Sequence, residues 1–473
     1  MGCGCTQYNL LYYKNHKYYT IMFIKNIKLQ NYRNYDRLNG NDGLNFGKKA
    51  TLLIGKNGAG KTNMIHALKQ SLSFIFSKSS KVSQRNFVAN TISSIKSFDT
   101  TDATRMRNED GKQSQEGTWP IKIITTVDLE SPNFPNNPLE VIFERENLSS
   151  GMKESYSDSS IAFWERYNHL EDLPVLAFYS DSFPHERQTI GKKIQELLNS
   201  EFGISQSAGY YNWDDPRDCC SVWLQYYIQQ WKNYMFGHRN NQEKEYLESI
   251  RNCIIFFSKS LENSEKNPDF EINDIIVVAR GKKEVVILKF NNGMESDFDS
   301  LPAGYRRAFS MAFDLANRAF LLNGNCNPDG VAFIDEIDLH LHPSIAQEIL
   351  ERMQSTFPRM QFIISTHSPL VLSNFEQDGD NYIVYRLTRD ADFATSIQRV
   401  DYSYGVDYNS LLTDLMGTKI RNTVLRKYIN DYIYWKSAEE SELAEESLER
   451  IIDIVGPESD VIEKLRKNNY GVH

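Results

Sequence analysis

The sequence has little cysteine and no long apolar run. Its 473 residues contain 6 cysteines, too few for a disulfide framework in a chain of this length, so a reducing compartment fits best. No stretch approaches the roughly 18 consecutive apolar residues that a membrane-spanning helix needs. Together these two absences predict a cytoplasmic protein without a membrane partner.

Positive charge is also scarce. The formal net charge of −9 argues against a uniformly basic surface for nucleic acid, although a local basic patch remains compatible with it. Basic residues form scattered clusters, such as Arg306-Arg307 and 281–283. Sustained heptads are missing as well, which excludes a long coiled coil.

The first 21 residues allow two interpretations. MGCGCT matches the pattern for myristoylation at Gly2, with Cys3 and Cys5 beside it as palmitoylation sites. Alternatively, translation starts at Met22, which directly precedes the strand-like run MFIKNIKLQNY. Because a six-residue match arises easily by chance, we treat the segment as an N-terminal extension.

A phosphate-binding loop is the clearest motif. Residues 50–54, ATLLI, are typical of a buried parallel strand, and GKNGAGKT (55–62) follows at once. The next segment, 63–76, has apolar residues at helical spacing. Strand, G-x-x-x-x-G-K-T and helix in this order predict a P-loop.

Each residue type in this loop has a physical reason. Glycines let backbone N–H groups turn toward phosphates, Lys61 brings a positive charge, and the hydroxyl of Thr62 suits Mg²⁺. The helix N-terminus adds a partial positive charge. We therefore expect these residues to bind the nucleotide phosphates: Asn57, Gly58, Ala59, Gly60, Lys61, Thr62 and Asn63.

Two further strand-like runs end in polar residues. VAFI (331–334) is followed by Asp335 and Glu336, and QFIIS (361–365) is followed closely by His367. In a P-loop enzyme the Asp holds Mg²⁺ and the next carboxylate polarises the attacking water. Because ligands of open α/β sheets bind at the carboxyl ends of the strands, we expect Lys61, Asp335, Glu336 and His367 to converge.

The same stretch, DEIDLHLHPS (335–344), has a second interpretation. His340 and His342 lie two positions apart near several carboxylates, which is compatible with a zinc or di-metal hydrolase site. Two residues at strand spacing also share a face. The residues alone leave both interpretations open.

A fourth motif lies in residues 298–322. The small-residue turn Ala303-Gly304 opens a segment with apolar residues at helical spacing. Such a turn presents backbone N–H groups to a phosphate, and no feature of the sequence suggests another need for it within its own subunit.

In chain order, GKNGAGKT, LPAGYRR (301–307), FIDEIDLHLHP (333–343) and ISTHSP (364–369) resemble the ABC-type ATPases of the RecF, SMC and OLD-like group. The resemblance implies an α/β fold: a P-loop ABC-type ATPase head with a parallel core sheet, a compact α-helical lateral insert and C-terminal helices. It also implies ATP and Mg²⁺ as cofactors, with Thr62 and Asp335 as metal ligands.

The resemblance assigns further roles. LQNYRNYDRL (29–38) is similar to the opening of this group, which places Arg33 and Asn34 near the nucleotide. Asp338 falls in the D-loop at a dimer interface, and the HLHP stretch is a family feature. Such ATPases dimerise head to tail, so Ala303 and Gly304 would cap ATP held by a second copy.

One position departs from the family pattern. The signature usually begins Leu-Ser, and the serine hydroxyl reaches the partner's γ-phosphate; here the position is Pro302, which has no hydroxyl and no N–H. Hydrolysis is therefore expected to be slow. A nucleotide-gated clamp has as much support as a fast motor.

Three further segments resemble one subgroup of these ATPases more closely. LPVLAFYSDSFPHER (173–187), AGYYNWDDP (208–216) and YGVDYNSLLTDLMGTKIRN (404–422) resemble PtuA-type ATPases of Septu and retron defence systems. No nuclease motif of the Toprim, HNH or zinc-ribbon kind is evident. The resemblance implies that the ATPase controls a separate HNH nuclease of the PtuB type, with DNA or a retron reverse transcriptase and its noncoding RNA as further candidate partners. The alternative is a RecF-like recombination ATPase that clamps DNA.

These features predict five segments along the chain. They are an extension (1–21), an N-terminal lobe with the P-loop (22–180), a helical insert (181–265), a C-terminal lobe with the remaining motifs (266–400) and a helical partner-docking region (401–473).

Overall fold

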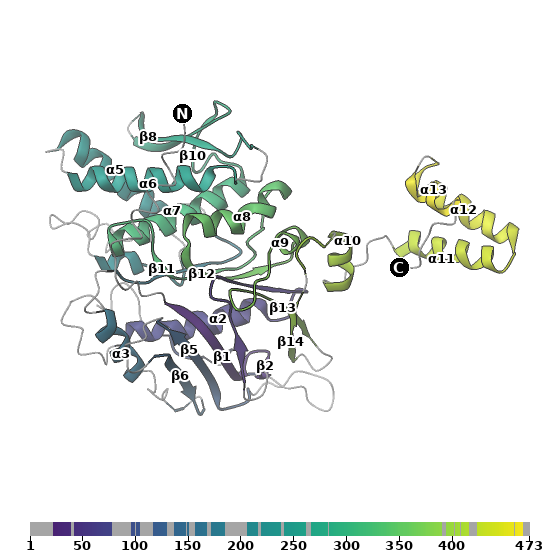
Figure 1. Cartoon of the computed structure of the whole chain (residues 1–473), viewed down its shortest axis with the longest axis horizontal. Coiled ribbons are helices and arrows are strands. Elements are labelled where there is room, and N and C mark those ends of the chain that lie inside the picture. The colour runs from purple at the N-terminus through teal and green to yellow at the C-terminus, as the bar shows by residue number, and fades with distance from the viewer. Residues whose placement is uncertain are drawn as a thin grey trace. The chain divides into compact units, whose positions relative to one another are not determined.

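Figure 1 shows the chain as a computed structural model. The structure describes residues 22–38, 42–77, 96–99, 101–104, 117–129, 137–147, 149–150, 157–167, 172–184, 206–215, 219–237, 241–261, 266–281, 283–389, 394–401, 403–406, 408–415, 423–457 and 459–466. The chain divides into two compact units, Met1–Val406 and Asp407–His473. The predicted extension 1–21 and its lipidation motif lie outside the described residues.

A six-stranded sheet forms the centre of the first unit, in the order β14-β13-β4-β12-β11-β7. All neighbours pair in parallel except β14, which runs antiparallel to β13. The strands are β4 (Ala50–Gly55), β7 (Val175–Tyr179), β11 (Asp329–Ile334), β12 (Arg359–Thr366), β13 (Tyr382–Arg389) and β14 (Thr395–Val400). Every residue of β4 and β11 is buried, as their apolar runs predict. The predicted parallel core sheet is confirmed.

The register of this sheet brings the motifs together. Ile334 at the end of β11 lies opposite Ile364 of β12 and Tyr179 of β7. Thr366 at the end of β12 lies opposite Ile54 of β4. Segments far apart in the sequence therefore end along one edge, where a parallel α/β sheet binds its ligand.

A second, antiparallel sheet packs beneath the first. Its order is β2-β1-β5-β6, with β3 paired to β1. The helix α2 (Lys61–Leu72) contacts strands of both sheets, and Gln361 of β12 donates to the carbonyl of Ile24 at 2.9 Å. The strands are β1 (Phe23–Tyr32), β2 (Tyr35–Arg37), β3 (Leu44–Asn45), β5 (Ile121–Asp128) and β6 (Leu139–Arg145).

Helices cover the other side of the core sheet. In Figure 1, α7 (Ala303–Asn323) and α8 (Pro343–Thr356) lie on the side of β11 and β12 opposite α2. The predicted helices of the insert are present as α5 (Cys219–Phe236) and α6 (Asn241–Ser258), and both contact α7. They are followed by a three-stranded antiparallel sheet of β8 (Ile272–Arg280), β9 (Lys283–Phe290) and β10 (Glu295–Asp297).

The described part of the first unit also contains shorter helices. A 3-10 turn, Ser73–Phe76, extends α2, and a second one, Gln206–Tyr210, contacts α7. The others are α3 (Ser157–Tyr167) and α9 (Pro369–Ser373). Within the described part of the chain, no helix is both long and apolar enough to span a membrane.

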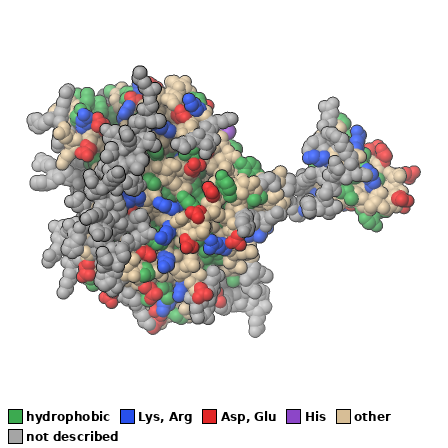
Figure 2. Space-filling view, viewed as in Figure 1, with side chains coloured by type: hydrophobic (Ala, Val, Ile, Leu, Met, Phe, Trp, Pro, Cys, Tyr) green, Lys and Arg blue, Asp and Glu red, His purple; other side chains and the backbone are tan. Residues whose placement is uncertain are grey.

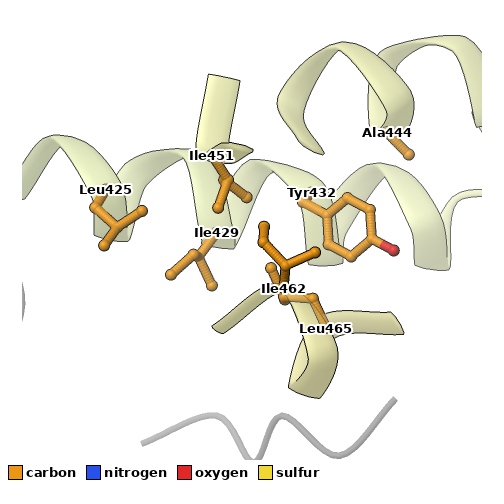
Figure 3. Close-up of a cluster of buried hydrophobic side chains, with 7 residues drawn as sticks. All are labelled: Leu425, Ile429, Tyr432, Ala444, Ile451, Ile462 and Leu465. Atoms are coloured by element: carbon orange, nitrogen blue, oxygen red, sulfur yellow. The ribbon is translucent and has the colours of Figure 1, made fainter. Parts of the chain in front are cut away.

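The second unit is a small helical bundle with its own core. It contains α10 (Tyr408–Ser410), a π-helical turn (Leu411–Leu415), α11 (Thr423–Ser437), α12 (Ser441–Val455) and α13 (Asp460–Arg466). Figure 3 shows the side chains that α11, α12 and α13 bury together: Leu425, Ile429, Tyr432, Ala444, Ile451, Ile462 and Leu465. The apolar stripe of α12 around Ile451 therefore packs inside this unit.

Candidate nucleotide site

The P-loop joins the end of β4 to α2. Gly58 and Gly60 have φ angles of 79° and 106°, values that side chains other than glycine adopt at a cost. Lys61 is 5% exposed, and its Nζ donates to the carbonyl of Gly55 at 2.9 Å. Burial lowers the pKa of Lys61 to about 8, while the nearby carboxylates of Asp335, Glu336 and Asp338 oppose that shift.

Two segments brace this loop from outside. The hydroxyl of Tyr35 donates to the carbonyl of Gly60 at 2.9 Å, and Thr395 Oγ1 donates to the carbonyl of Ala59 at 3.0 Å. A Cβ on Gly60 would lie 2.2 Å from Asn34 Nδ2. A side chain at this position would displace the Asn34 amide, and it would also strain the backbone at φ 106°. Asn57 and Gly58 at the loop tip are exposed.

Arg33, Asn34 and Asn63 form one hydrogen-bonded group beside the loop. Arg33 Nη1 donates to Asn63 Oδ1 at 2.9 Å, and Asn63 Nδ2 donates to Asn34 Oδ1 at 2.5 Å. Asn34 in turn donates to Thr395 Oγ1, and Arg33 pairs with Asp102 at 3.0 Å. The structure therefore brings these three predicted residues together at the start of α2.

Asp335 lies directly beside the P-loop. Thr62 Oγ1 donates to Asp335 Oδ2 at 2.8 Å, and Ser365 Oγ donates to Asp335 Oδ1. Ser365 also accepts the backbone N–H of Glu336 at 2.9 Å. The carboxylate is 5% exposed. Residues 273 positions apart in the chain thus meet as the P-loop pattern predicts.

Glu336 begins the turn after β11 with a left-handed backbone, φ 53°. Such a conformation is uncommon for a residue with a side chain. Burial raises the pKa of the Glu336 carboxyl, and the carboxylates of Asp335, Asp181 and Asp338 raise it further. Asp181 follows β7 and was not singled out in the sequence.

His367 follows β12 and lies near Glu336. Its Nε2 is 3.8 Å from Glu336 Oε1, too far for a hydrogen bond. Burial lowers the pKa of His367, and Lys61 lowers it further. Both effects favour the neutral imidazole, which can accept or donate one hydrogen bond.

The segment 335–344, which follows β11, is called the acidic turn. It also contains Asp338, His340 and His342. Asp338 accepts from Thr366 Oγ1 at 2.5 Å. His342 caps α8: its Nδ1 lies 2.9 Å from Ser344 Oγ and accepts from the backbone N–H of Ser344 at 3.4 Å. His340 is exposed with φ 64°. Among the residues that the structure describes, no group of three or more His, Cys, Asp or Glu side chains has metal-binding geometry.

The turn at Pro302, Ala303 and Gly304, which we call the signature turn, has a contact at Gly304 that we did not expect. A Cβ there would lie 2.4 Å from the carbonyl oxygen of His340, so this glycine is required by a contact in its own subunit. The earlier expectation of no such requirement is wrong. Pro302 and Ala303 are exposed, and Pro302 is the N-cap of α7 with φ −51°. The exposed part of the turn is therefore its first two residues.

The basic cluster Arg306-Arg307 is not a surface patch. Arg307 is 1% exposed, and its guanidinium donates to backbone carbonyls of the turns after β7 and β11. Arg307 therefore contributes nothing to a basic surface. The periodicity of the helix offered a signal, since Arg307 lies one turn before the buried Met311 and on the same face.

Two known proteins are similar to this chain in sequence. A retron Vc95 probable ATPase of Vibrio cholerae serotype O1 biovar El Tor is 24% identical over 402 residues, which cover 74% of this chain and 71% of the relative. The Septu protein PtuA of Bacillus thuringiensis is 22% identical over 452 residues, 91% of this chain and 93% of the relative.

A comparison with solved structures gives a distant match. An SMC head domain from Thermotoga maritima matches 80% of this chain and 99% of its own length, with a TM-score of 0.40 at 12% identity. The family model of the RecF/RecN/SMC N terminal domain matches residues 23–386. This span contains the P-loop, the acidic turn and the signature turn, and the chain belongs to the RecF/RecN/SMC N-terminal domain family.

Proposed function

We propose that the chain binds ATP and hydrolyses it to ADP and phosphate. The observation that carries this proposal is the 2.8 Å hydrogen bond between Thr62 at the start of α2 and Asp335 at the end of β11. It places a P-loop hydroxyl, a strand-end carboxylate and the buried Lys61 around one point. Three phosphates with a divalent cation are the ligand that this set of groups suits.

Mg²⁺ fits the same residues. A hydroxyl oxygen and a carboxylate oxygen are ligands that this hard cation prefers, and Asp335 is held by Ser365 so that one oxygen faces Thr62. Bound there, the ion would neutralise charge on the phosphate oxygens. Thr62 and Asp335 are therefore the protein ligands that we propose.

Within this chain the chemical roles divide among neighbours. Lys61 offsets phosphate charge, and Glu336 accepts a proton from the attacking water. The raised pKa of Glu336 makes it a stronger base than an ordinary glutamate. His367 is neutral and close enough to orient the water or a phosphate oxygen by a hydrogen bond. The loop residues Asn57 to Asn63, with Arg33 and Asn34, hold the nucleotide.

A second copy of the chain would complete the site. The exposed start of α7, at Pro302 and Ala303, is free to approach a nucleotide held by another molecule. Its N-terminal N–H groups favour negative charge. We propose a head-to-tail dimer in which this turn, with Gly304 behind it and Asp338 nearby, faces the partner's ATP.

The wider role that we propose is control of a separate HNH nuclease in cytoplasmic anti-phage defence. The similarity to a retron ATPase and to Septu PtuA supports it. The second unit supports it as well, because it has its own core and still exposes Val424, Tyr434, Leu443 and Ile454. DNA, or a retron reverse transcriptase with its RNA, remains a further candidate partner.

A RecF-like DNA clamp is the second candidate, and it has less support. Arg307 is internal, and Arg280, beside the other basic cluster, pairs with Asp297 at 2.9 Å. Figure 2 shows Lys and Arg interspersed with Asp and Glu on the visible face of the described surface. A DNA clamp needs a concentrated basic surface.

The first prediction concerns Lys61. Lys61→Ala should weaken ATP binding by on the order of 10–100-fold, because hydrogen bonds to charged groups are worth about 1.5–3 kcal/mol. In the wild type, affinity should fall as pH rises through about 8, where the free protein loses the Lys61 proton. Lys61→Arg should remove this pH dependence of the affinity, since arginine stays charged. Titration of the three proteins between pH 6 and 10 measures both effects; an unchanged affinity in Lys61→Ala contradicts the P-loop assignment.

The second prediction concerns Glu336. Glu336→Gln preserves the shape of the side chain and removes the base, so turnover should fall by roughly 10²–10⁴-fold while ATP still binds. The variant should also accumulate as the ATP-bound dimer. Steady-state hydrolysis, an ATP titration and mass measurement test these statements together. Hydrolysis at the wild-type rate would show that another group is the base.

The third prediction concerns Pro302. Pro302→Ser restores the signature hydroxyl, and one hydrogen bond to a charged group is worth about 1.5–3 kcal/mol, so turnover should rise. Proline also fixes φ ahead of α7, and its loss can loosen the turn. Thermal stability should therefore be measured beside turnover. A variant that folds and dimerises normally without faster hydrolysis would rule out the missing hydroxyl as the limiting factor.

The fourth prediction concerns the second unit. A tagged wild-type chain co-expressed with the product of an adjacent HNH gene should purify as a complex. Replacing Tyr434 and Leu443 by Glu should disrupt the complex, because both are exposed apolar side chains of this unit. The control is Phe236→Glu, an exposed apolar residue of the first unit. Loss of the complex in the control to the same extent would place the docking surface elsewhere.

A further inference from the structure

Arg307 has an unusual set of partners for a buried cation. Its Nη2 donates to the carbonyls of Asp335 at 2.7 Å and Glu336 at 3.1 Å. Its Nη1 donates to the carbonyls of Ser180 at 3.0 Å and Asp181 at 3.3 Å, and also to that of Phe183. One side chain of α7 therefore holds the turns at the ends of β7 and β11 together.

These carbonyls belong to the residues around the proposed base. Glu336 has a left-handed backbone with φ 53°, a conformation that persists only where its surroundings impose it. Arg307 binds the carbonyls of both peptide groups that flank the Cα atom of Glu336. The Ser365 hydroxyl binds the N–H of the same residue. The direction in which the Glu336 side chain leaves the backbone is thus set by Arg307 and Ser365.

A second contact links the same helical turn to the same acidic turn. Gly304, three residues before Arg307, packs so closely against the carbonyl of His340 that a Cβ would lie 2.4 Å from it. The first turn of α7 therefore contacts the acidic turn at both ends, at residues 335–336 and at residue 340. The exposed Pro302 and Ala303 begin this same turn of helix.

We propose that Arg307 is a positioning residue that fixes the Glu336 carboxylate for hydrolysis and passes any displacement of the exposed start of α7 to it. The inference rests on the proposed ATPase function. A guanidinium suits the task because its planar array of N–H groups donates to several carbonyls at once. Lysine has a compact ammonium group and cannot span both turns in the same way.

A purely structural role is the competing explanation, and the chain provides a matched control. Arg352 of α8 is 2% exposed, and its Nη1 donates to the carbonyl of Ser258 at 3.1 Å and to that of Lys259. It also pairs with Glu348 at 2.6 Å. Arg352 is thus a buried arginine that binds backbone carbonyls, but those of the end of α6.

The experiment compares Arg307→Lys and Arg307→Gln with Arg352→Lys and Arg352→Gln in the full chain. Thermal stability, ATP affinity and kcat are measured for each. Arg307→Lys should lower kcat at least tenfold and leave ATP affinity within about threefold, while Arg352→Lys should lose stability without that change in kcat. Where Arg307→Gln does not fold, Arg307→Lys carries the test, because it keeps the charge.

A further readout separates positioning from stability. In the Glu336→Gln background, Arg307→Lys should cause no further loss of single-turnover rate, since the group that it positions is already absent. Additive losses, or an equal loss of kcat in Arg352→Lys, would overturn the proposal.

Failure of the inference and failure of the proposed function are distinguishable. If the wild type hydrolyses ATP and Glu336→Gln abolishes it while Arg307→Lys remains fully active, the positioning role alone is wrong. If the wild type hydrolyses no ATP, the ATPase proposal itself is wrong.

Discussion

A buried polar side chain needs a hydrogen-bond or ion-pair partner. The helix α7 buries several such side chains along its length, among them Arg307, Asp314, Asn317 and Arg318. Asp314 and Arg318 form an ion pair at 2.7 Å with both side chains 0% exposed. Removing one partner of such a pair is strongly destabilising, because it leaves a buried charge. Asp314 also accepts from Tyr179 of β7 at 2.7 Å and from Trp223 of α5 at 2.6 Å. The pair therefore fixes α7 against both the core sheet and the insert.

The same helix continues this arrangement in both directions. Toward its C-terminus, Arg318 donates to the carbonyl of Gly209 at 3.0 Å, and Asn317 accepts from Tyr246 of α6 at 2.5 Å. Toward its N-terminus, Arg307 binds the turn that carries Glu336. One rigid helix thus connects the insert to the proposed catalytic turn. Movement of the insert relative to the sheet would require these buried hydrogen bonds to break.

Local patterns predicted the parts of this fold that depend on neighbouring residues in the chain. The apolar run before the P-loop is strand β4, and the helical spacing after it is α2. The segment predicted as a helical insert, 181–265, contains the helices α5 and α6. The meeting of Thr62 with Asp335 followed from the rule that parallel strands present their carboxyl ends at one edge.

Local patterns did not predict several contacts between residues that are far apart in the sequence. Asn34 and Thr395 are 361 positions apart, and their hydrogen bond depends on how the antiparallel strand β14 returns beside the P-loop. Arginine is normally exposed, so the pair Arg306-Arg307 suggested a surface cluster until the carbonyls around Arg307 were known. The close approach of Gly304 to the carbonyl of His340 could not be seen in the spacing of its motif either. In each case the deciding partner comes from another element of the fold.

The position of Pro302 has a consequence for the proposed cycle. Pro302 is the N-cap of α7, and Arg307 of the same helix binds the carbonyl of Glu336. The position without the signature hydroxyl is therefore connected rigidly to the proposed base. A second copy's ATP would then act on hydrolysis chiefly through the position of α7 and less through a direct hydrogen bond at residue 302. In the dimer that we propose, hydrolysis should be slow and should respond strongly to the geometry of the dimer. Such a response suits a protein that holds a partner until its nucleotide state changes.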